Sequence, residues 1–306
     1  MSEAPATPSK PLRPNHGHLQ PLNGLQLMLR EWPATSPAEA GPTLVMLHGF
    51  LDTGMTFFEL AAHLPWRMLA WDARGFGQSE HLPTAAYYHF YDYLGDLHAL
   101  LQTLPGPVHL LGHSMGGMIA SLYAGVFPDK VASLINLEGW MVPDGDPAST
   151  PERLARWLSE RQQPGSWKHF ASVAEAAVRL QKQDPQLSDR QAQVLAEAAL
   201  KPSPEGLSWG HDPLHRSRSP QPFRLDQALA CWQKVKAPTL LLAGADSPIH
   251  QLADQALRLQ AMQQAPRPTA YQVIPSAGHN LHLHQPEAVA QAIMAFVASL
   301  NPSLNP

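Results

Sequence analysis

Short apolar runs alternate along this chain with segments whose apolar residues recur at helical spacing. The runs are four to seven residues long, rich in leucine, valine and isoleucine, and bounded by glycine, proline or aspartate. They are Thr43–Leu47, Arg67–Trp71, Val108–Leu111, Val131–Leu137, Thr239–Ala243 and Ala270–Ile274. Such runs predict strands buried on both faces of a parallel sheet. Their alternation with helices predicts an α/β fold whose mostly parallel, twisted sheet is flanked by helices, and residues 16–32 predict an antiparallel hairpin at one edge.

One stretch, residues 140–234, breaks this alternation. It contains no run typical of a buried strand, but helix-like pieces rich in arginine, glutamine, alanine and glutamate, such as 151–163, 173–183 and 188–199. A single disordered loop of this length is the alternative, and structureless loops this long are rare in compact domains. The sequence therefore predicts a helical cap, inserted into a core formed by residues 23–139 and 235–300.

Residues 1–22 precede this core and carry many prolines but few apolar residues. Such a segment cannot bury enough apolar surface to offset its loss of conformational entropy. We expect it to be a mobile tail.

Composition excludes several classes of protein. The 21 basic and 25 acidic residues give a net charge of −4 without a basic cluster, so nucleic acid is not an expected partner. The single cysteine, Cys231, excludes an internal disulfide and a cysteine-based metal site. No apolar run approaches the roughly 18 residues of a membrane span, and the first residues do not resemble a secretory signal. We expect a cytoplasmic protein whose oligomeric state the sequence does not determine.

The segment that most favours an enzyme is Gly112-His113-Ser114-Met115-Gly116. An apolar run precedes it and a helical pattern follows, so Ser114 is expected on a sharp turn from strand to helix. Its hydroxyl would be exposed at the carboxyl edge of the sheet, close to the amides of a helix N-terminus. The alternative is a turn of small residues that only packs a helix on a strand.

A serine needs a base to become nucleophilic at neutral pH, and His279 is the candidate. It follows the last predicted strand, and its loop therefore ends on the same edge of the sheet as Ser114. His282 and His284 extend it to His-x-x-His-x-His, but no carboxylate or cysteine accompanies them, so no metal is expected. We expect His113 to pack beside the turn rather than to act in catalysis.

Two carboxylates could orient this imidazole. Glu138 ends the strand 131–137, and Asp246 follows the strand 239–243. Both keep the chain order serine, acid, histidine, and each has a loop or capping role as its alternative.

An oxyanion formed at Ser114 needs two hydrogen-bond donors already in place. The Met115 amide follows the nucleophile directly, and the Phe50 amide lies where the strand 43–47 breaks at Gly49. The charged, glycine-rich segment 72–79 is expected to be structural, with Asp72 and Arg74 paired to fix the loop.

Four segments together resemble the α/β-hydrolase fold superfamily over about residues 23–300. They are His48-Gly49-Phe50, Asp72-x-Arg74-Gly75-x-Gly77-x-Ser79, Gly112–Gly117 and Gly278-His279. His48–Asp52 and the Glu138-Gly139 turn are similar to serine hydrolase-like proteins and bacterial carboxylesterases. The resemblance implies Ser114 as nucleophile, His279 as base and the amides of Phe50 and Met115 as the oxyanion hole.

The chain departs from this family at the acid. The common position, three residues after the glycine that ends the strand, is occupied by Ser247, with Asp246 one residue early. Some members with serine at that position place the acid after the preceding strand, which favours Glu138 here. A serine nucleophile also argues against haloalkane dehalogenases and epoxide hydrolases, whose nucleophile is aspartate.

The sequence thus predicts a serine hydrolase that cleaves a small carboxylic ester with no cofactor. Aromatic residues of the cap are available to shape an apolar pocket: Trp157, Trp167, Phe170, Trp209 and Phe223. Alternatives at the same site are hydrolysis of a lactone, a thioester or a carbon–carbon bond, and cofactor-free perhydrolysis. A different class is a ligand-binding protein that keeps the hydrolase shape.

Overall fold

The computed structural model describes residues 14, 16–35, 43–83, 86–162 and 165–300. Most of the predicted tail, residues 1–13 and 15, lies outside this range. Its last residues do not form a tail, because His16–Leu22 is the first strand of the predicted hairpin. Pairing with the next strand supplies the backbone hydrogen bonds that order it.

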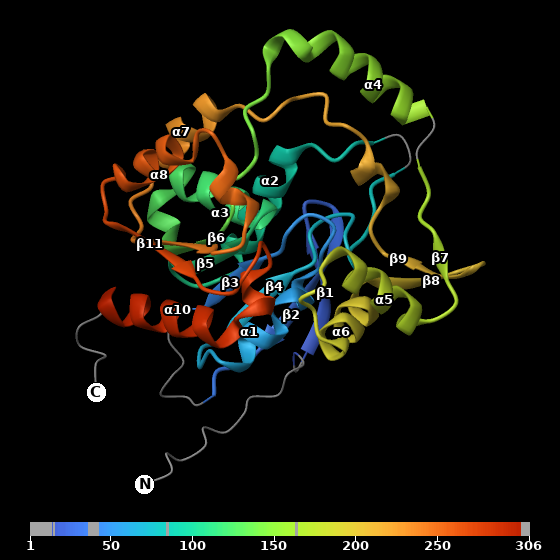
Figure 1. Ribbon diagram of the computed structural model, residues 1–306, viewed down its shortest axis with the longest axis horizontal. Coiled ribbons are helices and arrows are strands. Elements are labelled where there is room, and N and C mark those ends of the chain that lie inside the picture. The colour runs from blue at the N-terminus through green and yellow to red at the C-terminus, as the bar shows by residue number, and fades with distance from the viewer. Residues whose placement is uncertain (1–13, 15, 36–42, 84–85, 163–164, 301–306) are drawn as a thin grey trace, which may run out of the picture.

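Within the described residues a sheet of eight strands runs in the order β1-β2-β4-β3-β5-β6-β10-β11 (Figure 1). Its strands are β1 (His16–Leu22), β2 (Leu25–Trp32), β3 (Leu44–Leu47), β4 (Met68–Trp71), β5 (Val108–His113), β6 (Val131–Leu137), β10 (Thr239–Gly244) and β11 (Thr269–Ile274). The strands from β4 to β11 are parallel, whereas β2 pairs antiparallel with both β1 and β4. The predicted parallel α/β sheet with an antiparallel hairpin at one edge is confirmed.

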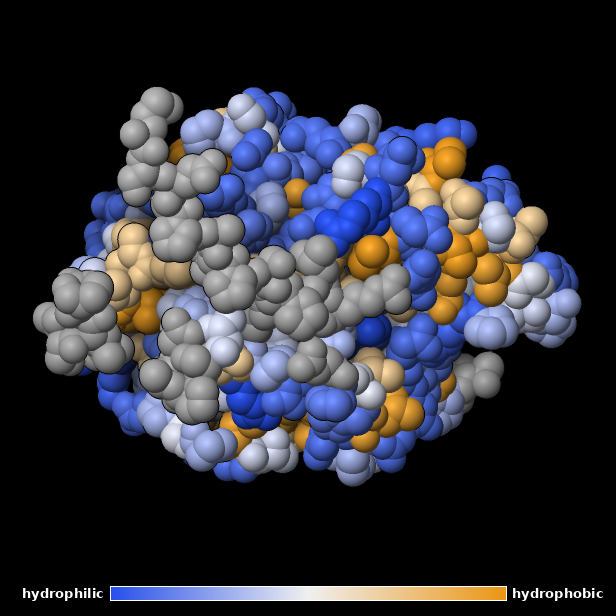
Figure 2. Space-filling view, turned by 90° about the horizontal axis from the view of Figure 1, so that it is seen from below, coloured by the Kyte–Doolittle hydropathy of each residue, from blue (hydrophilic) through white to orange (hydrophobic). Residues whose placement is uncertain are grey.

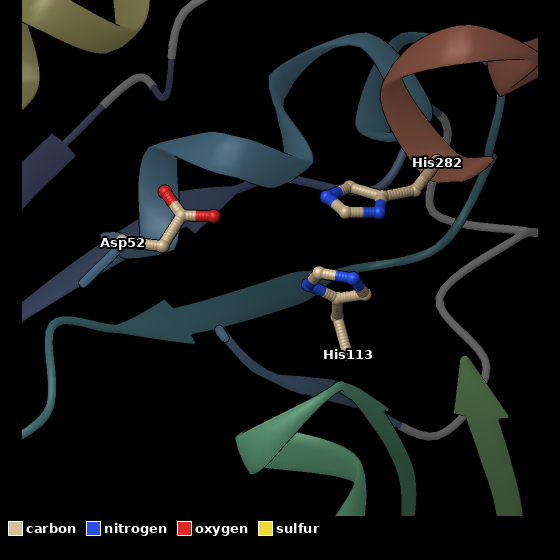
Figure 3. A group of neighbouring side chains, drawn as sticks. All are labelled: Asp52, His113 and His282. Atoms are coloured by element: carbon tan, nitrogen blue, oxygen red, sulfur yellow. The ribbon is translucent and has the colours of Figure 1, made fainter. Parts of the chain in front are cut away.

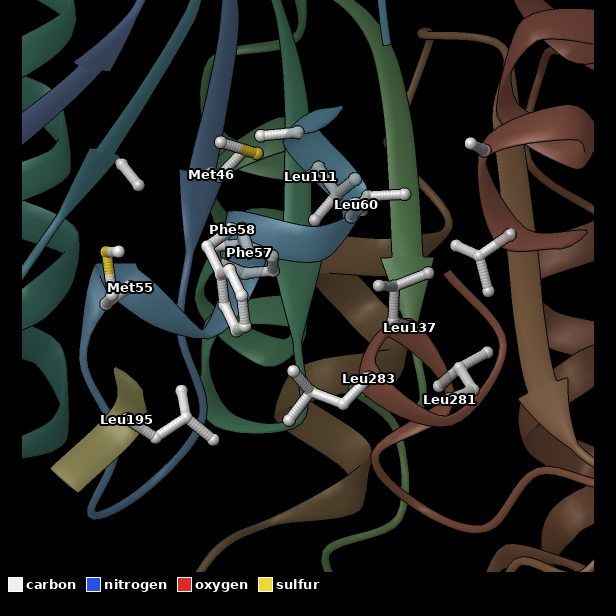
Figure 4. Packing of buried hydrophobic residues seen from close by; sticks show 14 of the residues in the cluster. Met46, Met55, Phe57, Phe58, Leu60, Leu111, Leu137, Leu195, Leu281 and Leu283 are labelled. Atoms are coloured by element: carbon white, nitrogen blue, oxygen red, sulfur yellow. The ribbon is translucent and has the colours of Figure 1, made fainter. Parts of the chain in front are cut away.

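Helices cover both faces of this sheet. The helices outside residues 140–234 are α1 (Phe58–Ala62), α2 (Phe90–Gln102), α3 (Met115–Val126), α8 (Gln255–Gln263), α9 (Leu281–His284) and α10 (Pro286–Leu300), with 3-10 helices η2 (Gly54–Phe57), η3 (Pro128–Lys130) and η6 (Pro248–Gln251). Alternate residues of β3 enter opposite cores: Leu44 and Met46 pack with α1 and α10, and Val45 packs with α2 and α3. Figure 4 shows the first of these cores, where Phe57 and Phe58 lie against the strands. This two-sided burial explains why the strands read as continuous apolar runs.

No strand from residues 140–234 joins the large sheet within the described part of the chain. The stretch contains α4 (Thr150–Gln162), α5 (Val173–Gln183), α6 (Asp189–Ala199) and α7 (Leu225–Trp232), the 3-10 helices η4 (Pro147–Ser149) and η5 (Pro213–Arg216), and a small sheet of β7 (His169–Phe170), β9 (Gly206–Trp209) and β8 (Leu200–Ser203). The small sheet was not predicted, because its strands have two to four residues and mostly half-exposed side chains. Helix α7 packs on α3 through Trp232 and Leu122, in the helical layer beside the large sheet.

The loop after β4 is held by ion pairs, but not by the predicted one. Asp72 pairs with Arg30 on the neighbouring β2 at 2.8 Å and accepts from the Gly54 amide. Arg74 instead forms a bidentate ion pair with Asp96 of α2, in which its Nε lies 2.6 Å from one carboxylate oxygen. The prediction that Asp72 and Arg74 pair with each other was wrong, because the adjacent strand and α2 offer each a nearer partner.

No helix in the described part of the chain has both the length and the apolar character needed to cross a membrane. The face of the molecule seen from below mixes hydrophilic residues with smaller groups of hydrophobic ones (Figure 2).

Several histidines are buried as neutral imidazoles. Nδ1 of His48 donates to the Gly49 carbonyl at 2.7 Å, and its Nε2 accepts from the Ala73 amide at 2.9 Å. Burial lowers the pKa of His48 and of His109 to about 4. The same cause lowers the pKa of His211 and of His215 to about 3.

These groups predict a loss of stability in mild acid. Below about pH 6.5 the unfolded imidazoles bind protons that the folded ones refuse, so the free energy of unfolding falls as pH drops from about 6.5 to about 4. Each such histidine contributes up to about 1.4 kcal/mol per pH unit. We expect the free energy of unfolding, measured with urea at several pH values across this range, to fall less steeply with decreasing pH for His109→Gln than for wild type. His63→Gln, at an exposed position, is the matched control, and an equal slope in both variants would contradict the account.

Candidate active site

Ser114 sits between β5 and α3 in a strained backbone conformation. Its φ of 50° and ψ of −114° lie where side chains are rarely tolerated. Its amide donates to the Leu137 carbonyl at 2.9 Å, and its own carbonyl accepts from Met118 in the first turn of α3. The sharp strand-to-helix turn expected at Ser114 is therefore present, and the hydroxyl projects at the carboxyl edge of the sheet.

Glycines allow this turn to close on the end of β3. A Cβ added at Gly112 would overlap the Gly116 carbonyl, and one added at Gly116 would overlap the carbonyl of Leu47. One at Gly49 would lie 3.4 Å from the Cβ of Ser114. The loop that carries Phe50 thus packs directly on the serine, and Met115 adjoins it as the first residue of α3.

His279 meets Glu138, not Asp246. His279 lies on the loop between β11 and α9, and its Nδ1 is 2.6 Å from Glu138 Oε2. The Glu138 side chain is completely buried, and its backbone has a φ of 57°. Asp246 is exposed, with its amide bonded to the Ala277 carbonyl. Of the two predicted acids, the structure brings only Glu138 to the imidazole.

The environment of Glu138 assigns the proton on the histidine. Its carboxylate accepts from the Gly244 amide at 2.7 Å and from the Ser247 hydroxyl at 2.6 Å. Because a carboxylate only accepts, Nδ1 of His279 carries its proton and Nε2 is left with a free lone pair. Ser247, at the common family position of the acid, thus hydrogen-bonds the carboxylate of Glu138. The serine at this position is the departure from the family pattern that favoured Glu138 in the sequence analysis.

The insertion, residues 140–234, is hydrogen-bonded to the loop that carries His279. Oδ2 of Asp184, at the end of α5, accepts from Asn280 Nδ2 at 2.6 Å and from His284 Nε2 at 2.8 Å. Nδ1 of His284 in turn accepts from the Gly278 amide at 3.0 Å. Burial alone would raise the pKa of Asp184, but these hydrogen bonds lower it. Sequence reasoning missed this clamp, since no local pattern joins residues about 100 positions apart.

A pocket of about 230 Å³ lies between the insertion, the loop after β3 and the loop of His279. Its lining is Phe50, Leu51, Asp52, Trp167, Leu180, Gln183, Asp184, Leu187, Leu195, Ala199, Trp209, His211, Asn280 and Leu283. Its charged lining residues are two aspartates, with no lysine or arginine among the described residues that line it.

Of the five candidate aromatic residues, two line this pocket, Trp167 and Trp209. Phe170 packs behind Trp209 with ring centroids 5.0 Å apart. Trp157 lies against Tyr87, and Phe223 lies beneath the guanidinium of Arg258.

The histidines around the site have different partners. Nε2 of His113 lies 3.0 Å from the His279 carbonyl, beside the turn as expected. Nε2 of His282 lies 2.8 Å from Thr56 Oγ1, whereas His284 bonds Asp184. The three histidines of His-x-x-His-x-His therefore do not share a ligand site with one another.

The sequence profile of the Alpha/beta hydrolase family matches residues 44–292. This chain belongs to the alpha/beta hydrolase family. The match includes β3 to α9, and with them the serine, the buried glutamate and the histidine just described.

Relatives of this alpha/beta hydrolase support a hydrolase activity. It is 27% identical over 280 residues to a serine hydrolase-like protein of Danio rerio, covering 87% of this chain and 84% of that protein. It is 30% identical over 283 residues to the sn-1-specific diacylglycerol lipase ABHD11 of Mus musculus, covering 84% and 81%. A thioesterase domain from the curacin biosynthetic pathway superposes with a TM-score of 0.80 at 30% identity, covering 91% of this chain and 99% of that one.

The close approach of α3 to β3 can be tested with a pair of glycine substitutions. Gly116→Ala should lower the urea midpoint of unfolding, because its Cβ meets backbone that cannot move aside. Gly95→Ala, on the exposed face of α2, meets only the end of the Asn23 side chain at 3.7 Å and should stabilise the protein by about 0.5–1 kcal/mol. A Gly116→Ala protein as stable as wild type would disprove this packing.

Proposed function

We propose that this alpha/beta hydrolase cleaves carboxylic esters through an acyl-enzyme, with Ser114 as nucleophile, His279 as base and Glu138 as the orienting acid. The observation that supports this most is the 2.6 Å hydrogen bond between His279 and a completely buried Glu138. It lies at the sheet edge where β5 ends in the strained Ser114.

The reaction has two halves, each using Nε2 of His279. Ser114 Oγ attacks the carbonyl carbon of the ester while its proton passes to Nε2. The bond to the alcohol oxygen then breaks, and the imidazolium returns the proton to the leaving group. Water then attacks the acyl carbon while its proton passes to the same nitrogen. The bond to Ser114 Oγ breaks, the imidazolium returns the proton to that oxygen, and the acid leaves. These steps need no cofactor and no metal.

Developing negative charge on the carbonyl oxygen needs donors fixed in advance. The amides of Phe50 and Met115 are the proposed pair, since their segments pack against Ser114 from either side. Each such donor is typically worth about 3–4 kcal/mol to the transition state. Glu138 stabilises the imidazolium that accompanies this charge.

The pocket indicates the class of substrate. Its lining of leucine and tryptophan side chains suits an apolar acyl or alcohol group, and Asp52 and Asp184 repel a substrate that carries a carboxylate. The insertion, residues 140–234, acts as the cap over this pocket. A neutral ester of modest size is the proposed substrate, consistent with a lipase among the relatives.

Thioester hydrolysis is the second candidate. The same steps cleave a thioester, and the thioesterase domain that superposes over 91% of this chain favours it. Parallel assays with the oxygen ester and the thioester of one acyl group rank these two candidate functions. Hydrolysis of a lactone or a carbon–carbon bond and perhydrolysis remain alternatives at this site.

A fluorophosphonate probe tests the activated serine directly. Intact mass should show one adduct on wild type and none on Ser114→Ala. His279→Ala should react at least about 100-fold more slowly, because the base is gone. Ser159→Ala, at an exposed serine of α4, is the control and should label like wild type. An unlabelled, folded wild type would favour a ligand-binding protein of hydrolase shape.

The two candidate acids make a second test. Glu138→Gln should lower kcat/KM by about 100- to 10,000-fold, because the imidazolium loses its partner. Asp246→Asn, at an exposed loop, should stay within about twofold of wild type. Ester hydrolysis is the measurement, with thermal unfolding to show that both variants are folded. A larger loss of kcat/KM in Asp246→Asn than in Glu138→Gln would show that Asp246, and not Glu138, is the orienting acid.

A further inference from the structure

Three side chains outside the proposed triad lie close to one another (Figure 3). Asp52 comes from the loop after β3, His113 from the end of β5 and His282 from α9. One ligand atom of each lies within 4.8 Å of those of the other two. Among the described residues, this is the one group of three histidine, cysteine or acidic side chains placed to hold a metal ion.

His113 directs a free lone pair into this part of the protein. Its Nε2 lies 3.0 Å from the His279 carbonyl, which only accepts, so Nε2 carries the proton. Nδ1 is then a bare acceptor, and it is buried without a hydrogen-bond partner in the described structure. His113 as a whole is only 3% exposed. A buried acceptor left in this way is costly and rare.

Gly49 packs against this nitrogen. A Cβ at Gly49 would lie 2.9 Å from Nδ1 of His113, so any side chain there would press on the nitrogen. Only glycine at this position leaves Nδ1 uncrowded.

The other two side chains complete a ligand set. His282 is completely buried, with its Nε2 at 2.8 Å from Thr56 Oγ1 and its Nδ1 unpaired. Asp52 is half-buried and lines the 230 Å³ pocket, which gives a small ion a route from solvent. A carboxylate and a bare imidazole nitrogen are both acceptors, so a group that binds both has to be a donor or a cation.

We propose that Asp52, His113 and His282 bind a divalent metal ion of the zinc type. Two imidazoles and one carboxylate are ligands that zinc favours, with a fourth position left for water. Atoms at the corners of a triangle with sides of 4.8 Å lie about 2.8 Å from its centre, so each ligand closes by about 0.7 Å to reach the 2.0–2.1 Å of a zinc bond.

The bound ion would act on the geometry of the hydrolase site. It joins the loop that carries Phe50, the strand that ends at Ser114 and the helix that follows His279. None of its ligands reaches the reacting bond in the proposed mechanism. Binding is therefore measured without substrate, and its failure leaves the proposed function intact.

Metal binding is tested on the full chain after removal of metal by chelation. Titration with Co²⁺ should give the visible absorption of a four-coordinate ion, lost on addition of Zn²⁺. Equilibrium dialysis against Zn²⁺ should find one tight equivalent in wild type. Asp52→Asn and His282→Gln should each bind at least about tenfold more weakly. His63→Gln removes an exposed histidine and is the matched control, expected to bind like wild type.

Two results would overturn the site. One is wild-type binding that is undetectable at micromolar metal, which would leave water as the group between the two acceptors. The other is equal binding by wild type and Asp52→Asn, which would place the ion on surface histidines. Asp52 is half-buried in a loop, so Asp52→Asn keeps the test valid even where His282→Gln does not fold.

Discussion

The buried carboxylate of Glu138 is the interaction on which this site depends. It accepts from three donors that come from separate segments: the Gly244 amide at the end of β10, the Ser247 hydroxyl beyond it and Nδ1 of His279 after β11. Burying an ionised carboxylate without hydrogen-bond partners costs several kcal/mol of free energy. The three hydrogen bonds therefore offset this cost and join the carboxyl ends of neighbouring strands.

The same interaction explains which parts of the site could be read from the sequence. Ser114 and His279 were placed by position alone, because the parallel order of strands brings their loops to one edge. The acid could not be chosen in this way, since Glu138 and Asp246 both follow strands that end there. What separates them is the φ of 57° that turns Glu138 inward and the Ser247 hydroxyl that meets it. The backbone angle depends on tertiary contacts that no local pattern encodes, whereas Ser247 was visible in the sequence and favoured Glu138 through the family resemblance.

The remaining differences have the same origin. The parallel strands could be predicted because both of their faces are buried and their sequences are continuous apolar runs. The small sheet β7-β9-β8 has few buried side chains, so its sequence shows no such runs. Asp72 and Arg74 are close in sequence, yet each pairs with a residue brought near by the fold, Arg30 and Asp96. The clamp from Asp184 to the loop of His279 was hidden for the same reason.

The hydrogen bonds of Asp184 connect the insertion, residues 140–234, with the loop of His279. Asp184 and Asn280 are hydrogen-bonded to each other, and both line the pocket. A group that fills the pocket thus touches the residues that hold the loop of His279. Under the proposed mechanism, the fit of the substrate and the position of the base are therefore coupled through the hydrogen bond between Asp184 and Asn280.

Three imidazoles crowd together beside the proposed nucleophile, and their surroundings differ. Rings of His113 and His279 are 4.8 Å apart, and those of His113 and His282 are 4.4 Å apart. Burial lowers the pKa of His282 to about 3 and that of His113 well below its usual value, so neither accepts a proton near neutral pH. His279 differs in two respects: its side chain is 30% exposed, and a carboxylate is hydrogen-bonded to its Nδ1. A partner of this kind on the other nitrogen is what the proposed base needs, and of these three imidazoles only His279 has a carboxylate at hydrogen-bond distance in the described structure.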